Sequence, residues 1–122
     1  MSIKNVSFIG LGVMGYPMAG HLQKNGYNVT VFNRNDSKAK KWVEEYGGQM
    51  GKTPNEACLN AEIVFMCVGR DEDIIEVMEG NNGILSSAKG GLTIVDHTTA
   101  SAEIARTYFT KLQGKNISFL DA

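Results

Sequence analysis

Short apolar runs recur along the chain, and segments with helical periodicity separate them. The predicted strands cover residues 6–9, 28–32, 63–68, 92–95 and 117–120, and Gln49–Met50 is a weak candidate for an edge strand. Apolar residues dominate these runs, and the run over residues 63–68 is uninterrupted. Such runs are typical of strands that are buried on both faces of a parallel sheet.

Helical periodicity fills the gaps between these runs. The segment after the first run repeats apolar residues every fourth position and ends at the helix-stop pair Asn25–Gly26. The sequence Thr53-Pro54-Asn55-Glu56 is a capping box, which predicts the start of a short helix. The apolar stripe of the segment after the first run is Met14, Met18 and Leu22. The stripes of the later predicted helices are Ala39, Trp42, Val43 and Tyr46, with a stop at Gly47; Ile74, Ile75 and Met78; and Ile104, Ala105, Tyr108, Phe109 and Leu112.

Strands that alternate with helices are joined by right-handed crossovers, so they form a parallel sheet with helices on both faces. Six strands are the number that two mononucleotide-binding halves require, with the strand order 3-2-1-4-5-6. The sequence therefore predicts an α/β fold, a doubly wound parallel sheet of the Rossmann type, as one domain over residues 1–122.

Composition and charge exclude several classes of function. Twelve basic and thirteen acidic side chains give a net charge of −1, so no long-range field attracts nucleic acid or anionic lipid. The longest apolar run, residues 63–68, is far shorter than the roughly 20 residues of a membrane span. Cys58 and Cys67 fit neither a zinc site nor a redox pair, and we expect two reduced, partly buried thiols. We expect a cytoplasmic domain that binds neither nucleic acid nor a membrane.

The sharpest motif is the glycine-rich segment Gly10-Leu11-Gly12-Val13-Met14-Gly15, which follows the first predicted strand and opens the first predicted helix. In this context the first glycine permits a tight turn, the second lets the backbone approach a pyrophosphate, and the third lets the helix pack against the sheet. The N–H groups of the helix N-terminus favour phosphate there. The motif predicts a dinucleotide site, and a turn that needs glycine for packing alone is the alternative.

The end of the second predicted strand indicates which dinucleotide binds. In the NAD pattern, an acidic residue about 20 positions further on binds the ribose 2′-hydroxyl. Here Asn33 lies 18 residues after Gly15, and Arg34 follows it. The planar charged fork of Arg34 suits phosphate, and Lys38 adds a second charge. We therefore expect NADP(H), with NAD(H) as the second choice; a solvated Arg34 is the alternative interpretation.

The sequence around the glycine-rich segment resembles that of a known protein family. The segment Phe8–Gly15, followed by Met18–Ala19, closely resembles the N-terminal signature of the β-hydroxyacid dehydrogenases. That family includes 3-hydroxyisobutyrate dehydrogenase, tartronate semialdehyde reductase and 6-phosphogluconate dehydrogenase. The resemblance runs along the whole chain, and Asn33–Arg34 matches the members that use NADPH. His21 is a departure, since the family usually has asparagine there.

The resemblance implies further site residues. Cys67-Val68-Gly69 falls where the family contacts the cofactor, although Gly69 replaces a proline. The segment 96–102 resembles the family's Asp-x-Ser-Thr-x-x-Pro, which would place Thr99 beside the nicotinamide. Asp73 completes the predicted cofactor contacts. Asp121–Ala122 matches the start of a motif that helps to bind substrate.

The activity implied by the resemblance is hydride transfer between the nicotinamide and a small hydroxy acid or semialdehyde. The family's catalytic lysine would lie beyond Ala122, together with a helical second domain, so no catalytic residue is assigned here. We therefore expect the chain to be the inactive cofactor-binding part of a longer, homo-oligomeric enzyme.

Four other functions are alternatives to this interpretation. A hydrolytic triad around Asp96 and His97 is disfavoured, because adjacent strand residues point to opposite faces. No spacing of histidine, cysteine or carboxylate residues supports a metal site. A regulatory nucleotide-binding module is an alternative, but it typically keeps an acidic residue after the second strand. An imine reductase-like enzyme on the same scaffold is a second alternative, and the sequence does not separate it from a dehydrogenase.

Overall fold

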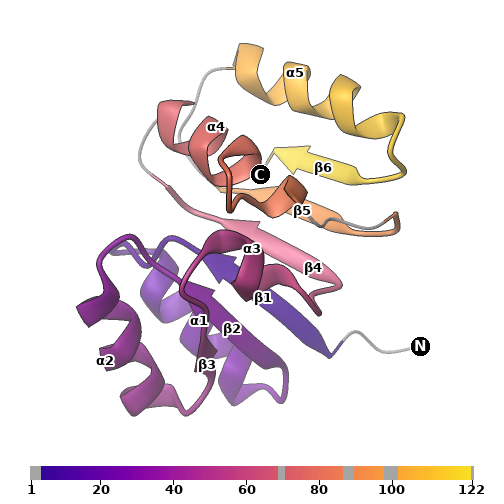
Figure 1. Ribbon diagram of the computed structural model, residues 1–122. Helices are drawn as coiled ribbons and strands as arrows, with labels where there is room; N and C mark the ends of the chain where they lie inside the picture. Colours follow the sequence, from indigo (N-terminus) through magenta and orange to yellow (C-terminus); the bar gives the residue numbers. More distant parts are fainter. Residues whose placement is uncertain (1–3, 69–70, 87–89, 98–101, 122) are drawn as a thin grey trace.

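The computed structural model describes residues 4–68, 71–86, 90–97 and 102–121, which form a six-stranded sheet with helices on both faces (Figure 1). All strand pairs are parallel, and the order is β3-β2-β1-β4-β5-β6, which confirms the predicted topology. The strands are β1 (Asn5–Ile9), β2 (Asn28–Phe32), β3 (Gln49–Met50), β4 (Ile63–Met66), β5 (Thr93–Asp96) and β6 (Ser118–Asp121). The fourth strand ends two residues earlier than predicted, and the last two are each shifted by one residue.

The helices cover the predicted segments, and several of their ends lie at predicted capping signals. They are α1 (Gly15–Lys24), α2 (Asp36–Tyr46), α3 (Pro54–Cys58), α4 (Asp71–Glu79), the 3₁₀ turn η1 (Ile84–Ser86) and α5 (Ala102–Gln113). Gly47 ends α2 in the left-handed region at φ +83°. The Thr53 side chain accepts a hydrogen bond from the Glu56 N–H at 3.0 Å and so caps α3. No helix in the described part of the chain is long and apolar enough to cross a membrane.

The core consists of two apolar clusters, one on each face of the sheet. The first lies under α1 and α2 and includes Phe8, Val31 and Trp42. The second lies under α3, α4 and α5 and includes Met66, Ile94 and Tyr108. The loops that carry candidate site residues leave the sheet at the carboxyl ends of β1, β2 and β4.

Three residues of the predicted apolar stripes are exposed. Ile75 is 44% exposed, because Ile74, Val77 and Met78 form the side of α4 that faces the core. Phe109 is 53% exposed, because α5 buries its neighbour Tyr108 together with Leu112. Met14 is 67% exposed, because it lies in the turn before α1. These three members of the predicted stripes therefore do not face the core.

Candidate dinucleotide site at the carboxyl edge of the sheet

The glycine turn leaves the sheet at the middle of its carboxyl edge. The Gly10 N–H donates to the Phe32 carbonyl of β2 at 2.8 Å, and the Cys67 N–H after β4 donates to the Ile9 carbonyl, also at 2.8 Å. The turn therefore lies between the ends of β2 and β4. Here the strand order reverses, and in open α/β sheets the crevice at such a switch point is where ligands bind.

The three glycines of the turn are under different constraints. Gly10 has φ +98°, and a Cβ there would lie 2.3 Å from the Cys67 carbonyl oxygen. A Cβ on Gly15 would lie 2.3 Å from the Gly10 carbonyl oxygen and 3.0 Å from the Phe8 ring. A Cβ on Gly12 would meet no heavy atom of the described residues within 4 Å. The fold itself requires glycine at the first and third positions, whereas the space beside Gly12 is open to a ligand.

The backbone around Gly12 offers hydrogen-bond donors that no described residue accepts from. Within the described residues, the N–H groups of Gly12, Val13 and Met14 have no acceptor, and α1 begins without a side-chain cap. Val13 is 93% exposed, so the turn projects into solvent. The first turn of α1 carries no acidic residue. Unpaired N–H groups at a helix N-terminus bind anions such as phosphate, and they fit the cofactor that the motif predicts.

Asn33 holds the turn in place. Its Oδ1 accepts from the Leu11 N–H at 2.9 Å, and its Nδ2 donates to the Asn35 carbonyl at 3.1 Å. The Asn35 side chain in turn caps α2 by accepting from the Ser37 N–H at 3.0 Å. Asn33 thus ties the glycine turn to the end of β2. This positioning contact was not found by sequence reasoning, which treated Asn33 only as a cofactor contact.

A cavity of about 260 Å³ lies beside the turn and brings most of the predicted cofactor residues together. Two cationic side chains and one carboxylate contribute to its wall. Its lining consists of Ile9, Gly10, Leu11, Gly12, Phe32, Asn33, Arg34, Lys38, Cys67, Val68, Asp73 and Val77. Val13, Met14 and Gly15 belong to the adjoining turn and do not line the cavity.

Arg34, just after the end of β2, forms ion pairs with two carboxylates. Its Nη2 donates to Asp73 Oδ1 at 2.9 Å and to Glu76 Oε2 at 3.1 Å, and both carboxylates belong to α4. No carboxylate follows β2 directly in the sequence, yet the packing of α4 brings two to this position. The spacing of 39 residues between Arg34 and Asp73 carries no recognisable signal, so sequence reasoning missed the ion pair.

The remaining predicted residues lie along the same edge or outside the described residues. Burial, and to a smaller extent the charge of Asp96, raises the pKa of the Cys67 thiol, so this cysteine is no activated nucleophile at neutral pH. The backbone of Asp121 pairs with that of Asp96 at the carboxyl end of β5. Gly69, Thr99 and Ala122 lie outside the described residues.

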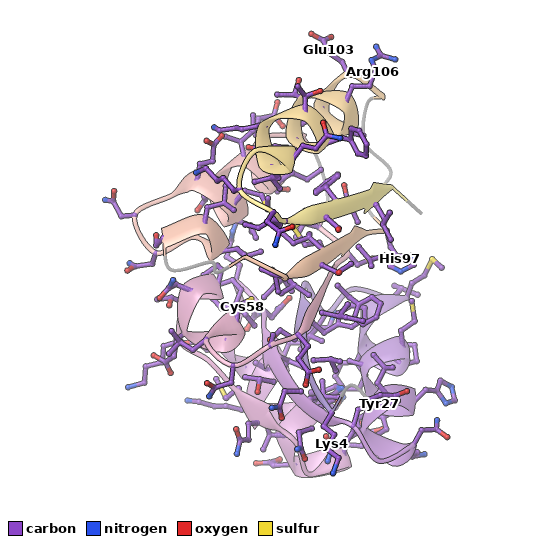
Figure 2. The ribbon with its side chains drawn as sticks, turned by 90° about the vertical axis from the view of Figure 1, so that its right-hand side faces the viewer. Lys4, Tyr27, Cys58, His97, Glu103 and Arg106 are labelled. Carbon is purple, nitrogen blue, oxygen red and sulfur yellow. The ribbon has the colours of Figure 1, made fainter. Side chains whose placement is uncertain are left out.

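His97 follows β5 at this edge (Figure 2). Its ring stacks on Phe65 with 6.1 Å between ring centroids. Asp96 beside it is buried, on the face of the sheet that α4 and α5 cover. No group of three histidine, cysteine or carboxylate residues among those described could hold a metal ion.

A larger hollow of about 530 Å³ lies at the opposite edge of the sheet. Asn5 and Asn28, at the amino ends of β1 and β2, line it together with Gly47, Gly48 and Gly51. It contains no residue of the glycine turn. We therefore place the candidate site in the smaller cavity, where open N–H donors and cationic side chains converge.

A glycine turn at the switch point of a six-stranded parallel sheet defines a dinucleotide-binding domain of the Rossmann type. A family model described as the NAD binding domain of 6-phosphogluconate dehydrogenase matches residues 5–122. The chain belongs to this family.

Curated relatives agree with this assignment. An oxidoreductase of Shewanella frigidimarina is 53% identical over 117 residues, which are 96% of this chain and 40% of the relative. The mitochondrial 3-hydroxyisobutyrate dehydrogenase-like protein 1 of Arabidopsis thaliana is 37% identical over 118 residues, 96% of this chain and 35% of the relative. The chain thus spans well under half the length of the relatives it matches.

Solved structures share the fold. The 3-hydroxyisobutyrate dehydrogenase of Mycobacterium tuberculosis superposes with a TM-score of 0.87 at 24% identity, over 99% of this chain and 40% of that one. An imine reductase of Myxococcus stipitatus, in complex with NAD⁺, gives a TM-score of 0.87 at 21% identity over the same shares. The chain is therefore a nicotinamide-nucleotide-binding domain of the kind found in 3-hydroxyisobutyrate dehydrogenase-like oxidoreductases.

Proposed function

We propose that this chain binds NADP(H) at the carboxyl edge of its sheet, as the cofactor domain of an oxidoreductase related to 3-hydroxyisobutyrate dehydrogenase. One observation carries the proposal: the open space and free N–H donors at Gly12 lie next to a cavity lined by Arg34 and Lys38. The first feature suits a pyrophosphate, and the second suits an additional phosphate on the adenosine ribose.

In this proposal the residues of the chain bind and orient the cofactor. The N–H groups of Gly12, Val13 and Met14 donate to the pyrophosphate. Asn33 holds the turn in register, while Arg34 and Lys38 bind the 2′-phosphate. The cofactor, when bound, supplies the hydride chemistry.

At the nicotinamide end, we propose that Cys67, Val68, Gly69 and Thr99 contact the cofactor and that Asp121 and Ala122 contact the substrate. That substrate would be a small hydroxy acid or semialdehyde. The longer protein would be cytoplasmic and homo-oligomeric. These assignments extend the resemblance of the sequence to the β-hydroxyacid dehydrogenases.

An imine reductase-like reaction is the second candidate, because imine reductases share this fold. That likeness, at 21% identity, concerns the fold alone. The curated relative named after 3-hydroxyisobutyrate dehydrogenase is closer in sequence, at 37% identity. We therefore favour a dehydrogenase that acts on a hydroxyl group.

Calorimetric titration with NADPH and NADH tests the proposal. Arg34→Ala should weaken NADPH binding by about 1.5–3 kcal/mol, the value of a hydrogen bond to a charged group, which is roughly 10–150-fold in Kd. NADH binding should change less than about twofold, because NADH lacks the 2′-phosphate. Lys40→Ala is the control, since this exposed lysine of α2 does not line the cavity. Equal losses for both cofactors would contradict the preference for NADP(H), and a wild-type chain that binds neither would contradict the proposed function.

A further inference from the structure

The ion-pair cluster formed by Arg34, Asp73 and Glu76 connects two parts of the fold across the candidate site. Arg34 follows β2, whereas the two carboxylates lie on α4, which follows β4. Both contacts use the same nitrogen, Nη2, so the two carboxylates share one corner of the guanidinium fork. The two carboxylates therefore occupy part of the Arg34 guanidinium, which the proposed function assigns to binding the 2′-phosphate.

We propose that Asp73 and Glu76 compete with the 2′-phosphate of NADPH for Arg34 and thereby set how strongly the site prefers NADPH over NADH. This inference rests on the proposed function. In the absence of a phosphate the carboxylates hold Arg34, and NADPH displaces them when it binds. NADH binds without displacing them, because it presents no group that needs the arginine.

The exposure of Arg34 and Glu76 makes such an exchange feasible. The side chains of Arg34 and Glu76 are 67% and 70% exposed, so water and salt screen their ion pair. Exposed pairs of this kind change an equilibrium by roughly 1.5–5-fold each. Competition of that size lowers the affinity for NADPH without preventing binding, because the apparent Kd rises only by the inverse of the fraction of free Arg34.

Asp73 has a second effect that Glu76 lacks. Its side chain is only 17% exposed and lines the cavity, whereas Glu76 lies outside the lining. A bound 2′-phosphate would therefore meet the charge of Asp73 inside the cavity even after Arg34 has turned toward the phosphate. Like charges that are shielded from water repel more strongly than exposed ones. We expect Asp73 to oppose NADPH more strongly than Glu76 does.

The test compares the NADPH and NADH dissociation constants of Glu76→Gln, Asp73→Asn and the double variant with those of the wild type. Glu76→Gln should tighten NADPH binding by about 1.5–5-fold, and Asp73→Asn by roughly 3–10-fold. The ratio of the two dissociation constants should shift toward NADPH in both variants. Glu72→Gln is the matched control, because it removes one negative charge from the same helix and should leave the ratio unchanged.

A second comparison separates competition from general charge repulsion. In the Arg34→Ala background the carboxylates have no arginine to hold, so Glu76→Gln should no longer tighten NADPH binding. If it tightens binding there as much as in the wild type, repulsion explains the effect and competition is wrong. An unchanged NADPH-to-NADH ratio in all three carboxylate variants also overturns the inference, while the proposed function stands. If the wild-type chain binds neither nucleotide, both fail together.

Discussion

Replacing Gly12 by alanine should separate cofactor binding from folding. The new methyl group would have no heavy atom of the described part of the chain within 4 Å, and Gly12 is not among the residues with positive φ. Alanine therefore fits the folded chain without strain, and it also reduces the conformational freedom of the unfolded chain. We expect the free energy of unfolding to stay within about 1 kcal/mol of the wild type.

Binding should respond very differently. The methyl group would project into the space that the proposed function assigns to the pyrophosphate, and it would hold the phosphates away from the N–H groups of the turn. Each hydrogen bond to a charged group is worth about 1.5–3 kcal/mol, so losing even one weakens binding by roughly 10–150-fold. NADPH and NADH should lose affinity equally, because both contain the pyrophosphate.

Gly15→Ala is the matched control, with the opposite expectation for stability. Its Cβ would lie 2.3 Å from the Gly10 carbonyl oxygen, so the helix and the turn must move apart. Overpacking of this kind costs about 1–3 kcal/mol, which lowers the melting temperature by roughly 3–15 °C for a domain of this size. Titration calorimetry and thermal melts of both variants supply the comparison. If Gly12→Ala binds NADPH as tightly as the wild type, or melts lower than Gly15→Ala, the reasoning about the turn is refuted.

Three further predictions concern positioning, reactivity and pH dependence. Asn33→Ala should lower the free energy of unfolding by about 1 kcal/mol and weaken the binding of both NADPH and NADH, because the Leu11 N–H loses its acceptor. Affinities equal to those of the wild type would contradict this prediction. Burial raises the pKa of the Cys58 thiol from 9.0 to about 12, and a hydrogen bond with Ser7 opposes this with a smaller effect. At pH 8 we therefore expect Cys58 to be alkylated roughly a thousandfold more slowly than an ordinary thiol, as measured by mass spectrometry. Alkylation at the ordinary rate would argue against that burial. Hydrogen bonds from Lys111 and Tyr108 lower the pKa of Glu79 below 4.5, so its ionised form stabilises the fold above that value and the contribution is lost as the pH falls. Glu79→Gln should therefore melt below the wild type at pH 7 and by a smaller margin at pH 3, and a margin that grows on acidification would contradict the sign.

Sequence reasoning predicted the topology because its signals are local. Every described strand but β3 overlaps a short, mainly apolar run, and helix ends such as Gly47 and Thr53 are marked by residues whose backbone or side chain fits that position. The glycine motif was equally informative, since Gly10 and Gly15 face steric limits that only glycine satisfies. Such features depend on near neighbours in the chain, so a sequence displays them directly.

The parts that sequence reasoning missed depend on contacts between distant segments. The carboxylates that hold Arg34 come from a helix 39 and 42 residues further along the chain, and no periodicity links them. The contact from Asn33 to Leu11 likewise crosses from one strand end to another. The apolar stripes of α4 and α5 were misassigned at Ile75 and Phe109 because hydrophobicity alone does not fix the angle of a helix over the sheet.

Backbone amide NMR of the chain titrated with NADPH tests most directly whether a nicotinamide dinucleotide binds at the carboxyl edge of the sheet. We predict saturable shifts that are largest at the amides of Gly12, Val13 and Met14, with further shifts at Arg34. The amides of Gly47, Gly48 and Gly51, in the hollow at the opposite edge, should stay unchanged. Shifts centred on those three glycines, or no saturable shift at the glycine turn, would contradict this prediction.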